Sequence, residues 1–524
     1  MKKRLVKPVA TILAVMTVAA SAVGCSSKSG GSSATTSSGK PLEFSYMSTT
    51  SEPFASHTTN AVLTEMQKEA NVKINYIWVP SSSYNDKIST TLASGTIPEI
   101  INAGGTSQSL LLNQSAIEPL DDLLKTNGKN ILARYTSDEY PFLRSPSDGK
   151  MYSIPTIVDF PYCYTWTYRS DMAKNVGITS DPVTWDDWVN MWKAVRDKDA
   201  NKDGGKAQKV PYMGDIYSLM PVFDMNVSNN LGFMVDDKGN YTLAEESPNF
   251  TKYLTAMQDL YKQGLLDPEF ATRGTYSDTG NNLDNGINSG LGFSWMSWAA
   301  DDRDATLVLR KTNASAICKA VLPPKSPIDN SQRMAARNKL YYGACFTVTA
   351  KKSGKMKQLM NFFNFLYSDK GVKLMSYGID GTMNKTENGK TTILQPYVND
   401  FNTARGNGIN YTPMTHFFTG DAYLQITLGG KSVDQVDDAT KEFYNGLMNN
   451  KPYLFAAVPT FQTDAYVKYQ AQIMPKITSL LDECVIGKIS VDSFKTQYNA
   501  LKPQGLQQIL DQGAAAYKKV SVKK

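Results

Sequence analysis

Strand-like and helix-like segments alternate at the start of the folded body, and this order limits the fold more than any other feature of the sequence. Residues 42–47 alternate apolar and polar side chains as a strand does, residues 72–79 form a second strand pattern, and residues 98–105 a third that runs into a glycine turn. Residues 58–70 and 84–94 between them read as helices. This order predicts an α/β fold with a parallel sheet, whose ligands bind beyond the carboxyl ends of the strands.

The first residues have the pattern of a secretory leader. Residues 1–7 are basic, and residues 9–23 are apolar apart from small Thr and Ser. This apolar run is shorter than the roughly 20 residues that a membrane-spanning helix needs, so we predict a signal peptide over residues 1–24. The small residues before Cys25 resemble the bacterial lipobox, although Ala22 stands where leucine is usual. The resemblance implies a diacylglycerol on Cys25; a secreted protein with a chance cysteine is the alternative.

The next segment, residues 25–41, is rich in Gly, Ser and Thr and predicts a flexible tether. About 484 residues follow residue 40, which is too many for one ordinary core, so we expect two lobes. The net charge of +6 falls to about +2 without the four basic residues of the leader (6 − 4). This balance, with no basic block, gives no indication of nucleic-acid binding.

The cysteines and histidines show no metal-binding pattern. Cys163, Cys318, Cys345 and Cys484 are widely spaced, and either buried free thiols or disulfides agree with the sequence. The chain has two histidines, neither in the spacing of metal ligands, which argues against a zinc site.

Many short segments, taken in order, resemble the family 1 extracellular solute-binding proteins, in their long Gram-positive group. The resemblance begins with residues 60–105 and covers nearly all of the chain after the leader. Its later segments are 116–120, 148–155, 168–171, 182–187, 261–270, 321–324, 365–381 and 487–517. No single segment is decisive, and the resemblance depends on their number and order.

The family resemblance implies a type II binding-protein fold of two α/β lobes joined by a hinge of several chain segments. We expect lobe 1 to contain residues 42–161 and 322–400, and lobe 2 residues 162–321 and 401–524. It implies a monomeric, non-enzymatic lipoprotein at the extracellular face of the cell membrane. Such a protein passes a small solute, here expected to be an oligosaccharide, to the permease subunits of an ABC importer. No cofactor is required for that role.

A sugar site combines aromatic rings with directional polar groups, and three regions have that composition. The first holds Trp295 and Trp298 after a glycine-rich strand, where the family has a stacking aromatic residue. The second is the expected hinge, with Asp159, Tyr162 and Trp166. The third comprises the loops after the first and third strands, with Glu52 and Asn102. We add Arg405 and His416 from a Gly- and Asn-rich region. A role in the core is the alternative for the aromatic residues of the first two regions, and a solvated charge or a packed histidine is the alternative for Arg405 and His416.

Trp185, Trp188 and Trp192 are aromatic residues that we expect in the core. Their spacing places them on one helix face, and Thr184 with Asp187 can form a capping box before it. Their number alone would suggest a sugar site, but the spacing is that of a packed helix.

The loop at residues 199–204 resembles the opening of an EF-hand calcium loop. Asp199, Asn201 and Asp203 stand at alternate positions, as oxygen ligands of calcium do. Val210 occupies the twelfth position, where an acidic residue would close the site. The pattern agrees with either a weakened structural calcium site or an ordinary turn.

Two other classes of function compete with sugar binding. A glycoside hydrolase or esterase would need positioned carboxylates or an activated nucleophile, and no such motif is present in the sequence. A binding protein for peptides or another non-sugar solute would share the fold, and an Arg and Asp pair at the cleft would favour it.

Overall fold

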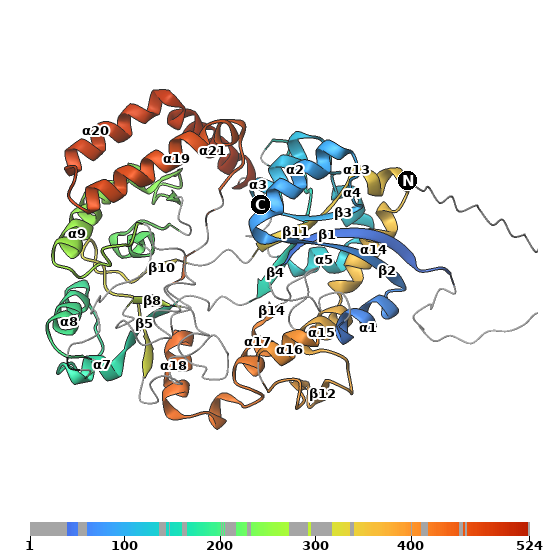
Figure 1. Ribbon diagram of the computed structural model, residues 1–524, viewed down its shortest axis with the longest axis horizontal. Helices are drawn as coiled ribbons and strands as arrows, with labels where there is room; N and C mark the ends of the chain where they lie inside the picture. The colour runs from blue at the N-terminus through green and yellow to red at the C-terminus, as the bar shows by residue number, and fades with distance from the viewer. Residues whose placement is uncertain are drawn as a thin grey trace, which may run out of the picture. The chain divides into compact units, whose positions relative to one another are not determined.

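The computed structural model has two large hydrophobic cores, each built around its own β-sheet (Figure 1). It describes residues 39–50, 60–135, 143–145, 147–159, 165–200, 202, 204, 216–227, 232–271, 292–294, 317–335, 340–399, 401–409, 418–449, 454–455, 458 and 460–521. Within these residues, no helix has the length and apolar character needed to cross a membrane.

The first sheet has six strands in the order β14-β4-β11-β3-β1-β2. They are β1 (Leu42–Thr50), β2 (Val72–Pro80), β3 (Ile100–Ala103), β4 (Ile154–Asp159), β11 (Leu340–Phe346) and β14 (Phe418–Thr419). β1 pairs in parallel with both β2 and β3, whereas β11 runs antiparallel to β3 and β4. The predicted α/β fold with a parallel sheet at its start is therefore confirmed.

Helices cover both faces of this sheet. One face packs Phe44 and Tyr46 of β1 against α1 and α14, and the opposite face packs Met47 and Ile101 against α2 and α3 (Figure 1). The helices associated with this sheet are α1 (Ala61–Glu69), α2 (Tyr84–Ser94), α3 (Thr106–Asn113), α4 (Asp121–Asn127), α5 (Lys129–Arg134), α13 (Val348–Lys352), α14 (Met356–Leu366), α15 (Asp369–Tyr377), α16 (Phe401–Gly406) and α17 (Gly420–Thr427). The helices and strands predicted over residues 42–105 correspond to β1, α1, β2, α2 and β3.

The second sheet is antiparallel, with three strands in the order β8-β5-β9. Its core is rich in aromatic rings from α8 and α9 and from the C-terminal helices. The strands and helices of this region are β5 (Thr165–Arg169), α7 (Ser170–Asn175), α8 (Trp185–Asp197), α9 (Phe250–Lys262), β8 (Gly292–Ser294), β9 (Cys318–Val321), α18 (Asp438–Asn449), α19 (Asp464–Val485), α20 (Val491–Leu501) and α21 (Leu506–Ser521). Helices α19, α20 and α21 pack together (Figure 1).

Three pairs of short strands complete the structure. They are β6 (Phe233–Val235) with β7 (Tyr241–Leu243), β10 (Met334–Ala335) with β15 (Leu454–Phe455), and β12 (Asn384–Glu387) with β13 (Lys390–Ile393). Two 3₁₀ helices contribute residues to the second core. They are η2 (Ile216–Phe223) and the shorter η3 (Ala244–Glu246).

The division of the chain between the two cores differs from the expected one after residue 400. We assigned residues 401–524 to the second lobe, but Ala404, Ile409, Ala422 and Ile426 pack in the first core. The reason is local, because α17 packs against β13 and carries Gln425, whose side chain accepts a hydrogen bond from the Ile393 backbone N–H at 2.9 Å.

Three of the four cysteines in question are buried free thiols. Cys318, Cys345 and Cys484 have no disulfide partner among the residues that the structure describes, and Cys163 lies outside them. Burial raises the pKa of the Cys345 thiol to about 12, which keeps it protonated and unreactive at neutral pH.

Candidate functional site

A row of three side chains lies at the carboxyl edge of the first sheet, across β2, β1 and β3. Ser48 pairs with Trp78 in the register of β1 and β2. Asn102 of β3 reaches Ser48 through its amide, with Nδ2 donating to Ser48 Oγ at 3.0 Å. Directly paired residues of parallel strands point to the same face, so Trp78, Ser48 and Asn102 form what we call the carboxyl-edge row. This is the position at which α/β sheets bind their ligands.

Asn102 is a buried amide whose hydrogen-bonding capacity is only partly used. Its exposed fraction is 8%, and its Oδ1 has no hydrogen-bond partner among the described residues. Such an atom costs the folded protein about 1–3 kcal/mol, and most buried polar groups avoid that cost by pairing. An amide held in place with one end unpaired can bind a ligand hydroxyl group.

The backbone around Asn102 is fixed from the other face of the sheet. The Tyr84 hydroxyl donates to the carbonyl oxygen of Asn102 at 2.6 Å and lies 3.2 Å from that of Met47. Tyr84 is buried, in the first turn of α2. It therefore ties the carboxyl ends of β1 and β3 together, so that Ser48 and Asn102 stay in register.

Trp78 is the aromatic member of the row, and our sequence analysis missed it. Its indole is half-buried and stacks on the Tyr76 ring, with centroids 4.9 Å apart and planes at 12°. Tyr76 in turn meets Tyr46 edge-to-face at 6.2 Å and packs against the first core. The strand pattern of residues 72–79 indicated a strand, but the register with Ser48 was needed to place Trp78 at the edge.

A tight turn brings the start of α3 to the same edge. Gly105 has φ 53° and ψ −125°, a backbone conformation that favours glycine. The Ser107 hydroxyl donates to the Gly104 carbonyl oxygen at 2.8 Å, and Gln108 Nε2 donates to Ser153 Oγ at 3.3 Å. These contacts connect the turn after β3 to the segment that enters β4.

Most of the other predicted site residues are not placed by this structure. Trp295, Trp298, Tyr162, Glu52 and His416 lie outside the described residues.

Two more are placed by their backbone alone. Asp159 ends β4 and pairs with Thr419 of β14, and Arg405 lies in α16. Of the nine predicted ligand-binding residues, Asn102 is the one whose side chain the structure describes at the carboxyl edge of the first sheet, and the backbone of Asp159 ends β4 at the same edge.

Trp166 occupies the second core instead of a ligand surface. Its exposed fraction is 1%, and its ring packs edge-on against Trp188 with centroids 4.9 Å apart. The strand β5 lies between β8 and β9, and the alternation of aromatic residues along it reflects packing. The sequence interpretation of Trp166 as a cleft residue is therefore corrected to a core residue in this structure.

The core assignment of the α8 tryptophans is confirmed. Trp185, Trp188 and Trp192 are all buried. The predicted capping box is also present, with the Asp187 backbone N–H donating to Thr184 Oγ1 at 3.1 Å and the Thr184 N–H to Asp187 Oδ2 at 2.8 Å.

The loop after α8 has the turn of a cation loop but an incomplete set of donors. Asp199 Oδ2 accepts a hydrogen bond from the Gly204 backbone N–H at 3.0 Å, and Gly204 has φ 78°. Asn201 and Asp203 lie outside the described residues, as does Val210. Since the side chain of Val210 carries no oxygen, the loop lacks the carboxylate that closes an EF-hand calcium site. No cluster of three or more His, Cys, Asp or Glu side chains suited to a metal occurs in the described part of the chain.

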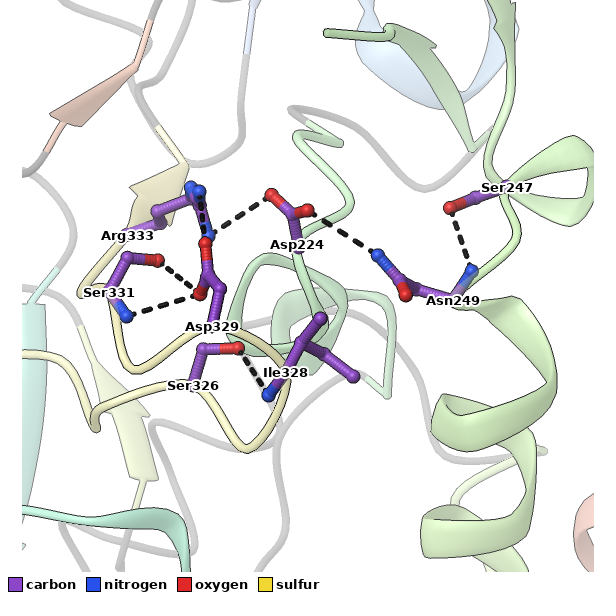
Figure 2. A network of polar contacts seen from close by, with 8 residues as sticks. All are labelled: Asp224, Ser247, Asn249, Ser326, Ile328, Asp329, Ser331 and Arg333. Carbon is purple, nitrogen blue, oxygen red and sulfur yellow. Dashed lines mark hydrogen bonds and ion pairs between the residues drawn. The ribbon is translucent and has the colours of Figure 1, made fainter.

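A charged network in the second region is the other polar cluster of note (Figure 2). Arg333 forms ion pairs with Asp224 at 3.0 Å and Asp329 at 2.7 Å, and Asn249 Nδ2 donates to Asp224 Oδ2 at 3.4 Å. Burial raises the pKa of Asp224 and the Arg333 charge opposes that shift, whereas hydrogen bonds from Arg333 and Ser331 lower the pKa of Asp329.

The network serves to hold the chain just before β10. The guanidinium is shared by two carboxylates, so its charge is already neutralised within the protein. The contacts connect residues 326–333 to the residue that follows η2, which explains them as packing of a turn.

Comparison with known proteins relates this geometry to a family. The sequence pattern of bacterial extracellular solute-binding proteins matches residues 55–373. Lipoprotein LipO of Bacillus subtilis (strain 168) is 28% identical over 273 residues, covering 49% of this chain and 50% of LipO. The polygalacturonan/rhamnogalacturonan-binding protein YtcQ of the same organism is 21% identical over 483 residues, covering 87% of each chain.

Solved structures share the fold at low sequence identity. The alginate-binding protein AlgQ2, solved without calcium ion, has a TM-score of 0.70 at 19% identity and covers 91% of this chain and 98% of its own. The Streptococcus pneumoniae ABC-transporter substrate-binding protein FusA, in complex with kestose, has a TM-score of 0.67 at 19% identity, covering 92% and 100%. Together with the matched sequence pattern, they show that the chain belongs to family 1 of the bacterial extracellular solute-binding proteins, the non-enzymatic ligand-capturing components of ABC transporters.

Proposed function

We propose that the chain captures an oligosaccharide at the carboxyl edge of its first sheet and delivers it to an ABC import permease. The observation that carries this proposal is the buried, half-paired amide of Asn102 beside Ser48 at that edge. Sugars present many hydroxyl groups that need directional partners, and an unpaired amide oxygen is such a partner. FusA, solved in complex with kestose, and YtcQ, named as a polygalacturonan/rhamnogalacturonan-binding protein, support a saccharide as the ligand class.

Capture by closure of two lobes is the mechanism we propose. The two cores are packed separately, and the chain passes from the first to the second between β4 and β5, back between β10 and β11, and to the second again after α17. We therefore assign residues 42–159 and 340–428 to one lobe, and 165–335 and 438–521 to the other. A ligand that contacts both lobes favours the closed form by its difference in affinity for the two states.

Anchoring through a lipid on Cys25 is a further part of the proposal. The leader over residues 1–24 and the tether over 25–41 would hold the folded body at the outer face of the membrane. Two acyl chains suffice for stable attachment. Metabolic labelling with an alkyne fatty acid tests this, with Cys25→Ser as the control that should lose the label.

A thermal-shift screen tests the capture function directly. The chain is measured against oligosaccharides, short peptides and amino acids, and a ligand that binds only the folded state raises its unfolding temperature. A response to one sugar class, weakened in Asn102→Ala and kept in Asn499→Ala on the exposed face of α20, would support the proposal. A response to peptides and to no sugar would replace it with peptide capture.

A further inference from the structure

The part of the carboxyl edge formed by the neighbouring strands β3, β1 and β2 is built from residues without formal charge. Residues 100–117, which contain β3, its glycine turn and α3, include no Asp, Glu, Lys, Arg or His. The same is true of residues 44–51 in and after β1, and of residues 74–85 in and after β2. Each of these three strands therefore contributes only uncharged groups, and β4, which runs parallel to β3 on the far side of β11, ends in an acid, Asp159.

An acidic sugar would find no cation in this part of the site. The carboxylate of a uronic acid needs an ionised donor when water is removed from it, and a missing charged hydrogen bond lowers affinity by about ten- to a hundredfold. The first turn of α3 offers backbone N–H groups, but a helix N-terminus strengthens anion binding by only a factor of about two to five. The first charged residue after β1 is Glu52, which is acidic like the uronic acid and so offers it no ion pair.

The row also provides an apolar surface for a sugar ring. Trp78 stacks on Tyr76, which packs against the first core, so the indole is backed by fixed aromatic rings. Ser48 and Asn102 follow it across the sheet, and Asn102 Oδ1 is unpaired among the described residues. An aromatic face beside a hydroxyl and an amide matches a ring with one C–H face and neutral hydroxyl groups at its rim.

We infer that the carboxyl-edge row is the subsite for an uncharged sugar ring and that the substrate is a neutral oligosaccharide and not an oligouronide. This inference depends on the proposed function, because it names the class of sugar captured at the same edge. Trp78 provides the apolar floor and Asn102 the polar anchor. A neutral substrate would also distinguish this chain from YtcQ and AlgQ2, whose names state polygalacturonan and alginate as ligands.

A competition experiment with the purified full chain distinguishes the two classes. The chain is incubated with oligogalacturonides, with the same oligosaccharides after chemical reduction of their carboxyl groups, and with neutral fructans and milk oligosaccharides at equal concentration. Bound sugars are identified by native mass spectrometry. Recovery of neutral sugars alone is expected. Preferential recovery of oligogalacturonides would overturn the neutral-substrate inference and leave sugar capture intact, and recovery of no sugar would overturn both.

The salt dependence of binding gives a second readout for the sugar recovered. Affinity for a neutral sugar should change by less than about twofold between about 0.05 and 0.5 M salt, because no ion pair is formed. A steep loss of affinity with salt would contradict the inference.

Substitutions at the carboxyl-edge row and beside it test the role of these residues in binding. Trp78→Ala should weaken binding of the recovered neutral sugar about tenfold, which corresponds to about 1.4 kcal/mol, and Trp78→Phe should weaken it less. Thr106→Lys places a cation at the exposed first position of α3 and should increase affinity for oligogalacturonides relative to their reduced forms.

Asn102→Asp should weaken all sugars, and Asn499→Asp makes the same charge change on an exposed helix position elsewhere as its control. Unchanged binding in both Trp78→Ala and Asn102→Asp would overturn the assignment of this row as a subsite.

Discussion

The two sheets of this protein place the same kinds of residue in different surroundings. At the carboxyl edge of the first sheet, Trp78 is half-buried and stands beside a serine and an asparagine. In the second core, Trp166 and Trp188 are 1% and 0% exposed and pack against each other. The comparison shows that the number of tryptophans in a segment says little about ligand binding. What distinguishes the two uses is whether polar groups share the face on which the ring lies.

Unpaired polar atoms show the same contrast. The Trp188 Nε1 donor and the Asn102 Oδ1 acceptor are both buried without a partner among the described residues. The indole nitrogen is enclosed by other aromatic rings, so its cost is part of packing a large side chain. The amide lies where a strand ends, and a ligand can supply the missing bond.

The contrast between the two sheets would be contradicted most clearly if the second core stayed stable after loss of a tryptophan. Trp188→Ala should lower the free energy of unfolding by about 3–5 kcal/mol, because it removes contacts with Trp166, Tyr168 and Trp192. Trp188→Phe should cost less, since it also removes an unpaired N–H group. Urea unfolding followed by circular dichroism measures both. Trp78→Ala serves as the comparison at the edge, and a larger loss of stability there than in Trp188→Ala would reverse the two roles.

The second region also holds a half-buried acid, Glu245, whose Oε2 atom is enclosed by the protein, whereas the carboxyl-edge row has no charge at all. Burial raises the pKa of Glu245 to about 7, and the nearby Glu246 adds to the shift while a backbone hydrogen bond opposes it. The folded state therefore favours the protonated acid. Its contribution to stability is fully present below the unfolded pKa of about 4.5 and is lost as the pH rises through about 7.

Glu245→Gln should remove this loss. The change in the free energy of unfolding between about pH 5 and pH 8 should then be about 2 kcal/mol smaller than in the wild type. Asp482, whose pKa burial raises to about 6, will leave a smaller dependence of the same sign. Glu387→Gln, on the exposed β12–β13 hairpin, is the matched control and should leave the pH profile as it is. Equal profiles for the wild type and Glu245→Gln would contradict the buried, protonated state.

The helix that carries three of the core tryptophans depends on its first residues. Thr184→Ala removes the capping box of α8 and should cost about 1 kcal/mol of unfolding free energy. Thr496→Ala, at an exposed position inside α20, should be neutral or slightly stabilising because alanine favours helices. Equal effects of the two changes would mean that the cap does not hold α8 in place.

Calcium should have the smallest effect. The loop after α8 lacks an acidic residue at Val210, so calcium at about 1 mM should add less than about 0.5 kcal/mol to the free energy of unfolding. Thermal unfolding with calcium, with magnesium and with a chelator measures this. Val210→Glu restores the missing carboxylate and should make the calcium response larger. A strong response of the unmodified chain would show that the present donors suffice.

Local sequence patterns predicted the parts of the fold that depend on neighbouring residues. The spacing of apolar residues identified α1, β2, α2 and β3, and the pattern at Thr184 and Asp187 identified a capping box that the structure confirms. These features are decided within a few residues of the chain, where propensity and hydrogen bonding act directly.

The candidate site could be predicted less well from the sequence, because its residues are brought together by the register of neighbouring strands. Asn102 was predicted from its place after a strand, but its contact with Ser48 joins residues that are 54 positions apart. Trp78 was missed because the pattern of its own strand does not indicate that it pairs with Ser48 of β1. The opposite error occurred for Trp166, since alternation along β5 looks the same for a core face and a ligand face.

The antiparallel strand in the middle of the first sheet has a consequence for folding. β11 lies between β3 and β4, yet β5 to β10, which belong to the second region, stand between β4 and β11 in the chain. Until it arrives, two strands keep open hydrogen-bonding edges, and closing so long a loop is slow. The first sheet is therefore completed only when the chain returns from the second region, and until then the open edges of β3 and β4 can pair with other chains and promote aggregation.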